Sequence, residues 1–290
     1  MNVAELVNGG KTDINITLTA DIDLTGKDWT PIGTDYDNSY KGTFDGGGHT
    51  ITGLTFTTND EFAGLFGWLN RAGTVKNVVM EGVQITSNQI YGGSIGGVVG
   101  YSWGTIENCS VSGSVSGTMY VGGVVGVQRD GSITGCSSSA TVKGTIKVGG
   151  VAGQTIFGAT LTACYATGNV NIEIDRTQDI SGGGLVGFND GISLLSCYAT
   201  GNVTSTGSST GYVHIGGFLG DNYITVTACY WKNNHEQGIS YNRGSTNVTK
   251  VDGTNVTWEN AVDAMNTALQ NAGSEWRYEL KGALPTLMKQ

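Results

Sequence analysis

Five cysteines offer the most versatile chemistry in this sequence, because thiols form disulfides and bind metals. They are Cys109, Cys136, Cys164, Cys197 and Cys229. Each follows a Gly-x-x-Gly segment by 9 to 11 residues, and Val78 holds the same place in the first repeat. Parallel stacked side chains suit neither the torsion of about 90° in a disulfide nor the tetrahedral geometry of zinc. We therefore expect a ladder of buried free thiols and no cofactor.

The other residues able to carry acid–base or metal chemistry show no complete motif. His49, His214 and His235 lie in different repeats, without a partner at motif spacing, so we expect surface or core histidines. Asp35 and Asp37 could ligate calcium, although the twelve-residue calcium-loop pattern is incomplete. Carbohydrate catalysis would need two carboxylates at a set separation, which the sequence does not supply.

Aromatic residues follow three of the column cysteines directly. Tyr165, Tyr198 and Tyr230 therefore point outward on successive repeats, and Trp231 adds a fourth ring. Such a row suits stacking on sugars or on a protein partner. The alternative is that longer loops cover these rings, or that they stack only on each other.

These residues are positioned by a repeated glycine box. Its six copies are Gly64-Leu65-Phe66-Gly67, Gly97-Val98-Val99-Gly100, Gly123-Val124-Val125-Gly126, Gly150-Val151-Ala152-Gly153, Gly184-Leu185-Val186-Gly187 and Gly217-Phe218-Leu219-Gly220. The final glycines of the boxes are separated by 33, 26, 27, 34 and 33 residues. A nearly constant minimum with occasional extra residues indicates one structural unit with loops of variable length.

Side chains around each cysteine alternate with the period of a strand that has one buried face. Four residues after Cys109 comes Gly113, and two residues later comes Val115. A unit of about 26 residues is too short for a propeller blade, and the leucine-rich-repeat pattern is missing. The pattern predicts a β-solenoid whose turns stack at about 4.8 Å.

Composition agrees with an all-β chain. The 290 residues include 48 glycines and only 2 prolines, which argues against collagen and against a helical bundle. The net charge of -9 argues against nucleic acid and against an anionic membrane surface. No apolar stretch is long enough to span a bilayer.

We expect residues 1–290 to form a single domain. Residues 1–60 would be an N-terminal cap with irregular turns, 61–235 the six repeats, and 236–290 a C-terminal loop, helix and strand cap. A helix is predicted over 258–272, with Thr257 as its N-cap and Gly273 at its end. Together with a last strand from Trp276 to Leu280, this helix should form a lid over the open final turn.

At these residues the chain resembles the GLUG-repeat family of bacterial surface and secreted proteins. The glycine boxes carry the resemblance, each followed by an Ile-x-x-Cys or similar step, together with Trp29-Thr30-Pro31-Ile32-Gly33 and Leu284-Pro285-Thr286-Leu287. Such repeats are frequent in gut Bacteroidetes and occur beside the catalytic part of immunoglobulin-A-specific metallopeptidases. The resemblance implies a right-handed parallel β-helix with an adhesin-like or scaffolding role and no shared catalytic residues. The zinc motif of those peptidases is absent from this sequence.

The expected function is non-enzymatic adhesion or scaffolding on a bacterial cell surface or outside the cell, with a glycan or surface-protein partner. Extra residues between 67 and 100, 153 and 187, and 187 and 220 would form the loops that recognise this partner. The main alternative is a carbohydrate-active β-helix enzyme, either a polysaccharide lyase or a glycosidase. Ice binding is a weaker alternative. No signal peptide is visible, and a chain from which a leader had been removed would look the same.

Overall fold

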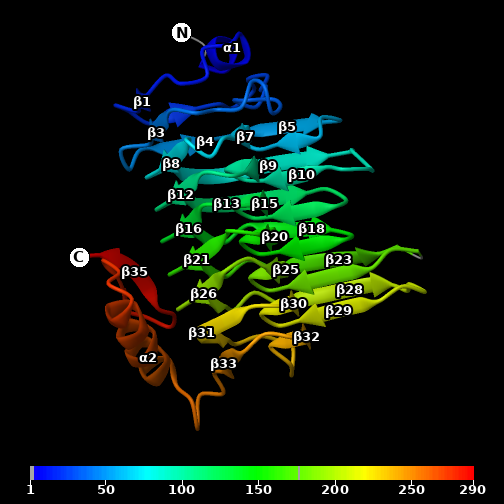
Figure 1. The fold of residues 1–290 in the computed structure, drawn as a ribbon, viewed down its shortest axis with the longest axis vertical. Helices are drawn as coiled ribbons and strands as arrows, with labels where there is room; N and C mark the ends of the chain where they lie inside the picture. The colour runs from blue at the N-terminus through cyan, green and yellow to red at the C-terminus, as the bar shows by residue number, and fades with distance from the viewer. Residues whose placement is uncertain (1–2, 176) are drawn as a thin grey trace.

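The protein is a stack of turns, each built from short strands that pair with strands in the turns above and below (Figure 1). The computed structural model describes residues 3–175 and 177–290. The pairing between turns is parallel and in register, so that Ile106 aligns with Val75 on one side and Ile133 on the other. The predicted all-β parallel solenoid is confirmed.

The strands of these turns form three parallel sheets in the described residues. The largest sheet contains β1 (Ile16–Thr17), β2 (Ile22–Asp23), β3 (Thr43–Asp45), β4 (Thr50–Thr52), β5 (Thr55–Thr58), β8 (Thr74–Lys76), β9 (Val79–Ser87), β12 (Thr105–Glu107), β13 (Ser110–Ser116), β16 (Ser132–Thr134), β17 (Ser137–Ser138), β18 (Thr141–Gly144), β21 (Thr160–Thr162), β22 (Tyr165–Ala166), β23 (Val170–Ile174), β26 (Ser193–Leu195), β27 (Tyr198–Ala199), β28 (Val203–Gly207), β31 (Thr225–Trp231) and β33 (Thr246–Lys250). The pre-box sheet contains β6 (Phe62–Ala63), β10 (Ser94–Gly96), β14 (Tyr120–Gly122), β19 (Lys147–Gly149), β24 (Ile180–Gly183) and β29 (Val213–Gly216). The post-box sheet contains β7 (Phe66–Leu69), β11 (Val99–Ser102), β15 (Val125–Gln128), β20 (Ala152–Ile156), β25 (Val186–Asp190), β30 (Leu219–Asn222) and β32 (Ile239–Asn242).

A corner with left-handed backbone precedes the cysteine column. The φ angle is +50° at Asn108, +53° at Ala163 and +52° at Ser196. A residue in this conformation breaks the strand alternation. Ile106 and Cys109 are therefore both buried although they are three residues apart. The corner is the structural reason for the Ile-x-x-Cys step.

The five cysteines are free and stacked in the core, each no more than 1% exposed. The backbone N–H of Cys109, Cys164 and Cys197 donates to the sulfur of the cysteine in the next turn, at 3.3 to 3.4 Å. The Cys197 thiol in turn donates to the Leu195 carbonyl at 3.3 Å. Burial raises the pKa of the Cys109, Cys136, Cys164 and Cys197 thiols well above its ordinary value. The sulfurs thus accept hydrogen bonds from corner amides in addition to filling apolar space.

The N-terminal end is covered by helix α1 (Val3–Asn8), which buries Ala4 and Val7 against the first turns (Figure 1). At the other end the solenoid continues beyond residue 235, where the repeats were expected to stop. Strand β32 pairs with β30, and β33 pairs with β31. A further turn therefore forms without a glycine box, because its backbone pairs with the turn before it.

The predicted C-terminal helix is confirmed as α2 (Trp258–Asn271). The Thr257 hydroxyl accepts from the Asn260 N–H, and the Asn260 side chain accepts from the Thr257 N–H, which completes a capping box. Val262, Met265 and Leu269 are buried on one face of the helix. An antiparallel hairpin follows, made of β34 (Trp276–Glu279) and β35 (Thr286–Lys289).

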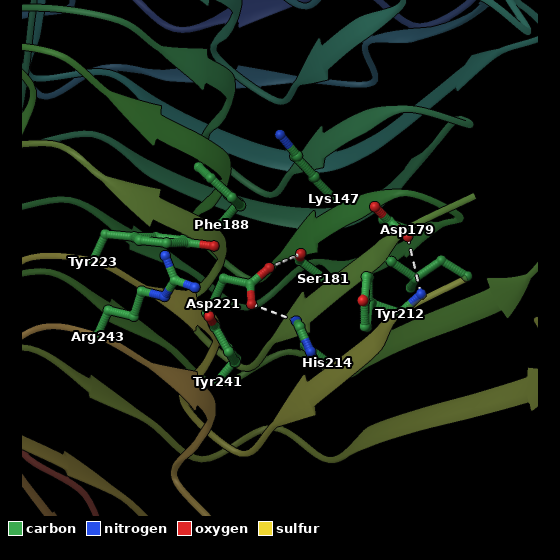
Figure 2. A pocket seen from close by; sticks show the side chains of 11 residues that line it. Lys147, Asp179, Ser181, Phe188, Tyr212, His214, Asp221, Tyr223, Tyr241 and Arg243 are labelled. Carbon is green, nitrogen blue, oxygen red and sulfur yellow. Dashed lines mark hydrogen bonds and ion pairs between the residues drawn. The ribbon is translucent and has the colours of Figure 1, made fainter. Parts of the chain in front are cut away.

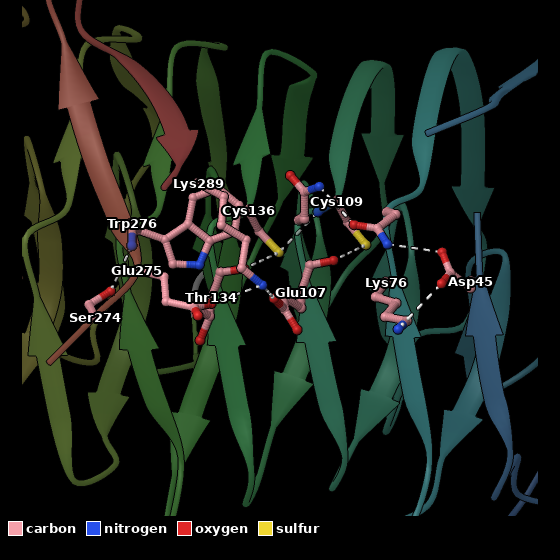
Figure 3. Close-up of polar contacts among 12 residues, drawn as sticks. Asp45, Lys76, Glu107, Cys109, Thr134, Cys136, Ser274, Glu275, Trp276 and Lys289 are labelled. Carbon is pink, nitrogen blue, oxygen red and sulfur yellow. Dashed lines mark hydrogen bonds and ion pairs between the residues drawn. The ribbon is translucent and has the colours of Figure 1, made fainter. Parts of the chain in front are cut away.

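The expected position of this cap is wrong. Helix α2 and the hairpin lie along the flank of the solenoid, not over its last turn (Figure 1). The Tyr278 hydroxyl donates to the Ser196 carbonyl at 2.9 Å. Lys289 pairs with Glu107 of β12 at 2.8 Å (Figure 3), and β16, β21, β26 and β31 follow β12 in the same ladder before the last turn. The flank offers apolar rings and small residues that match the apolar face of α2. Neither described helix is long and apolar enough to cross a membrane.

Candidate functional site

Two columns of side chains flank the glycine boxes on the outside of the solenoid. The strands before and after each box pack backbone against backbone: a Cβ on Gly100 would lie 2.7 Å from the Ser94 carbonyl oxygen, and one on Gly187 would lie 2.7 Å from that of Ser181. Only glycine fits this close approach. The residue three positions before most boxes therefore comes close to the residue just after a box. The residue types at these two positions vary from turn to turn.

A cavity of about 450 Å³ lies where these columns meet in the last four turns (Figure 2). Strands β19, β24 and β29 contribute Lys147, Ser181 and His214, whereas β25, β30 and β32 contribute Phe188, Asp221 and Tyr241. The remaining lining residues are Asp179, Ile180, Tyr212, Tyr223 and Arg243. Asp179 and Tyr212 come from two of the three segments in which the sequence has extra residues.

Asp221 is the most enclosed charged group of this pocket, with 4% of its surface exposed. Its Oδ1 lies 2.6 Å from Nδ1 of His214, and its Oδ2 accepts a hydrogen bond from the Ser181 hydroxyl. The His214 ring stacks on Tyr241 with centroids 4.8 Å apart, and on Tyr212 at 6.0 Å. The imidazole is thus fixed by a carboxylate and two rings, with Nε2 on the side away from Asp221.

Two cations of the pocket lie on aromatic rings. Lys147 Nζ is 4.0 Å from the centroid of Phe188, and the Arg243 guanidinium is 5.4 Å from that of Tyr241. Burial lowers the pKa of Lys147, while the charges of Asp221 and Asp190 act in the opposite direction. The pocket therefore combines flat apolar ring faces with positively and negatively charged hydrogen-bonding groups.

A cluster of aromatic rings lies on the same outer face, nearer the N-terminus. It consists of Tyr36, Phe62, Trp68, Tyr101 and Trp103. Trp68 and Tyr101 align directly in the post-box sheet, with centroids 4.6 Å apart. The indole nitrogens of Trp68 and Trp103 are enclosed without a hydrogen-bond partner in the described residues. We call this group the aromatic cluster.

The tyrosine row predicted as an exposed binding stripe is instead covered. Tyr165 and Tyr198 stack with centroids 4.9 Å apart and planes 3° apart, but Tyr198 is only 1% exposed and Tyr230 only 7%. Helix α2 and the hairpin pack on them, and the Tyr198 hydroxyl donates to the Pro285 carbonyl at 2.5 Å. Trp231 is 8% exposed and points into the core. The outward direction of the tyrosines was predicted correctly, whereas their exposure was not, and the alternative of covered rings holds.

The carboxylates proposed for calcium lie in a surface loop. Asp35 accepts hydrogen bonds from the Asn38 amide at 2.9 Å and from the Thr34 hydroxyl at 3.0 Å. The Asn38 hydrogen bond holds the pKa of Asp35 below its ordinary value. Asp37 is exposed. Within residues 3–175 and 177–290, no three His, Cys, Asp or Glu side chains gather to hold a metal ion.

His214, Asp221, Lys147 and Phe188 were not predicted as site residues from the sequence. One signal was available, because the residue immediately after each glycine box differs in chemistry from repeat to repeat. In chain order these residues are Trp68, Tyr101, Val127, Gln154, Phe188 and Asp221. Because the residue type at this position changes from repeat to repeat, the packing of the repeat does not require a particular side chain there.

Comparison with known proteins supports the repeat assignment. The family model described as the GLUG motif matches residues 91–116 and 117–143. Halomucin of Haloquadratum walsbyi is 39% identical over 126 residues, which cover 40% of this chain and 1% of that protein. A candidate Gly-rich membrane protein of Evansella cellulosilytica is 37% identical over 100 residues, covering 33% of this chain and 11% of that protein. The chain thus spans only a small part of the curated relatives it matches.

The fold also has a counterpart among solved structures. The crystal structure of a candidate immunoglobulin A1 protease from Bacteroides ovatus superimposes with a TM-score of 0.75, covering 99% of this chain and 89% of that one. The two sequences are 22% identical, so this likeness shows the fold alone. The resemblance predicted from the glycine boxes is confirmed by the motif match.

Proposed function

From the premise that this chain carries GLUG repeats, we propose that it is a surface-displayed or secreted module that binds a carbohydrate in the pocket around Asp221. The observation that carries this proposal is the pocket itself. Rings of Phe188, Tyr223 and Tyr241 surround the polar groups of Asp221 and His214. Sugars present apolar C–H faces to rings and hydroxyls to such polar groups, and a concave site with this lining is typical of ligand binding.

The location outside the cell is supported by the relatives, one named a mucin and another a membrane protein. A solenoid suits this role because its strands fix the pocket residues on a rigid frame, while Asp179 and Tyr212 enter from loops. Binding would then be a property of the module, with adhesion or scaffolding as the consequence of display.

The test is a glycan-array screen followed by calorimetric titration of the best ligand. Phe188→Ala and Tyr241→Ala should each weaken binding by about tenfold, since one stacking contact is worth roughly 1.4 kcal/mol. Tyr91→Ala is the matched control, because Tyr91 is 80% exposed and lies outside the pocket. Equal affinity of all three variants and the parent protein would refute the pocket as the binding site.

A carbohydrate-active enzyme is the second candidate, and the contact between Asp221 and His214 is the observation that favours it. A carboxylate that orients an imidazole is an arrangement used in general acid–base catalysis. Purified protein incubated with the glycans it binds would release reducing ends or unsaturated products. Turnover that disappears in His214→Ala would establish catalysis, whereas unchanged glycans over a long incubation would leave binding as the activity.

A further inference from the structure

The pocket and the aromatic cluster lie on the same outer face of the solenoid, and ring and cation contacts extend from the pocket as far as Tyr120. We call this whole surface, from the aromatic cluster to the pocket, the outer band. Between them, Lys147 lies over both Tyr120, at 5.5 Å, and Phe188, at 4.0 Å. Phe188 then contacts Tyr223 at 5.3 Å, and Tyr223 contacts Tyr241 at 5.9 Å.

The register of the post-box sheet places the band on one face. Trp68, Tyr101, Val127 and Gln154 align in successive strands, and Phe188, Asp221 and Tyr241 continue the same column. Seven strands at a spacing of about 4.8 Å extend over about 29 Å. A ligand that follows this column would be extended and several units long.

Three cations occur along the band, and each lies on rings. Arg129 is 5.2 Å from Trp103 and 4.5 Å from Phe157, and Lys147 and Arg243 lie on rings of the pocket. Among the described residues, none of the three forms an ion pair with a carboxylate within 4.0 Å.

A partly buried cation without a carboxylate partner differs from a solvated surface cation, because burying an unpaired charge is costly. Lys147 is partly removed from water, so its charge lacks both full hydration and a close counterion. The acidic groups whose charges act on Lys147 are Asp221, which contacts His214, and Asp190, and Asp179 also lines the pocket. An anionic group on the ligand would supply the missing partner of Lys147, and charge-assisted hydrogen bonds of this kind are among the strongest.

We propose that the outer band binds a linear acidic polysaccharide, with sugar units along the rings and acid groups at Arg243, Lys147 and Arg129. This inference rests on the proposed carbohydrate pocket and extends it to a polymer and to a charge. An extended peptide fits less well, because peptides commonly add a strand to a free sheet edge. The band is the face of a sheet whose strands are already paired on both sides.

The experiment measures affinity for a panel of linear acidic polymers: polygalacturonate, alginate and chondroitin sulfate. Digalacturonate and methyl-esterified polygalacturonate serve as short and uncharged counterparts. We expect the best acidic polymer to bind at least tenfold more tightly than its dimer, and added salt to weaken it. Lys147→Gln should weaken binding by about tenfold.

Arg129→Gln separates the band from the pocket, because Arg129 lies beside the aromatic cluster. It should weaken polymer binding while leaving dimer binding unchanged. Lys143→Gln is the matched control, since Lys143 is on the largest sheet and pairs with Glu173 at 2.7 Å. Equal binding of the esterified polymer, an unchanged Arg129→Gln variant, tighter binding of polyglutamate, or no binding to any acidic polymer would overturn the inference. If Phe188→Ala nevertheless loses affinity for the best ligand of the glycan array, the carbohydrate pocket is still upheld.

Discussion

Replacing Cys197 with valine tests whether the thiol column acts as a hydrogen-bond acceptor or only as apolar filling. Cys197 is fully buried, and its sulfur accepts the Cys164 N–H at 3.3 Å. Valine fills the same space without an acceptor, which leaves that amide unpaired in the core. An unpaired buried donor costs about 1–3 kcal/mol, whereas the additional carbon contributes at most about 0.8 kcal/mol.

The expected balance is a loss of about 1–2 kcal/mol from the free energy of unfolding. For a domain of this size class, this corresponds to a fall in Tm of roughly 2–8 °C. Cys197→Ser is the matched control, because a serine hydroxyl can still accept from Cys164 and donate to the Leu195 carbonyl, as the thiol does. Circular dichroism during thermal and urea unfolding measures both variants under reducing conditions.

The order of stability among the parent protein and the two variants distinguishes an acceptor role from apolar filling. If the column is an acceptor ladder, the valine variant is less stable than both the parent and the serine variant. A valine variant as stable as the parent, together with a strongly destabilised serine variant, would refute the acceptor role. The thiols would then be ordinary apolar core residues, as Val78 is in the first repeat.

Three further predictions concern the core and the cap. Val170→Asp should prevent folding, because it places an unpaired carboxylate at a position that is 0% exposed; soluble protein with unchanged melting would contradict the inward assignment. Gly135→Ala should detach the hairpin, since its φ is +64° and a Cβ there would overlap the Trp276 indole; faster proteolysis of the C-terminal segment, with an intact solenoid, is the expected readout. Asp252 accepts backbone N–H groups before α2, chiefly that of Val256, which lowers its pKa. These hydrogen bonds stabilise the folded protein at pH values above the pKa that Asp252 has in the unfolded chain. Their contribution is lost as the pH falls through the lower pKa of Asp252 in the folded protein. Acid should therefore increase the rate of amide exchange in this loop of the parent protein but change it little in Asp252→Ala.

The repeated part of the fold could be predicted from the sequence because its determinants are local. Alternation around Cys109 and Val115 specifies which residues point inward, and the glycine box specifies where strands approach closely. The capping residue Thr257 and the spacing of Val262, Met265 and Leu269 place α2 to within one residue at its end. None of these features requires knowledge of residues far away in the chain.

The candidate site could not be predicted in the same way, because exposure of an outward side chain depends on distant segments. Tyr198 and Asp221 both point away from the core. A hairpin 87 residues further along the chain covers Tyr198, with its Pro285 carbonyl accepting from the tyrosine hydroxyl. Asp221 instead meets Ser181, 40 residues earlier, and His214.

The sequence by itself therefore determined the repeating turn of the solenoid, its period and its inward side chains, because the same short pattern of apolar and glycine residues is present in every repeat. Only the tertiary structure decided which outward column would be buried under α2 and which would remain open as a pocket. That choice depends on which face of the solenoid the helix packs against. Burial of its apolar side on the tyrosine flank leaves the pocket beside the glycine boxes open to water.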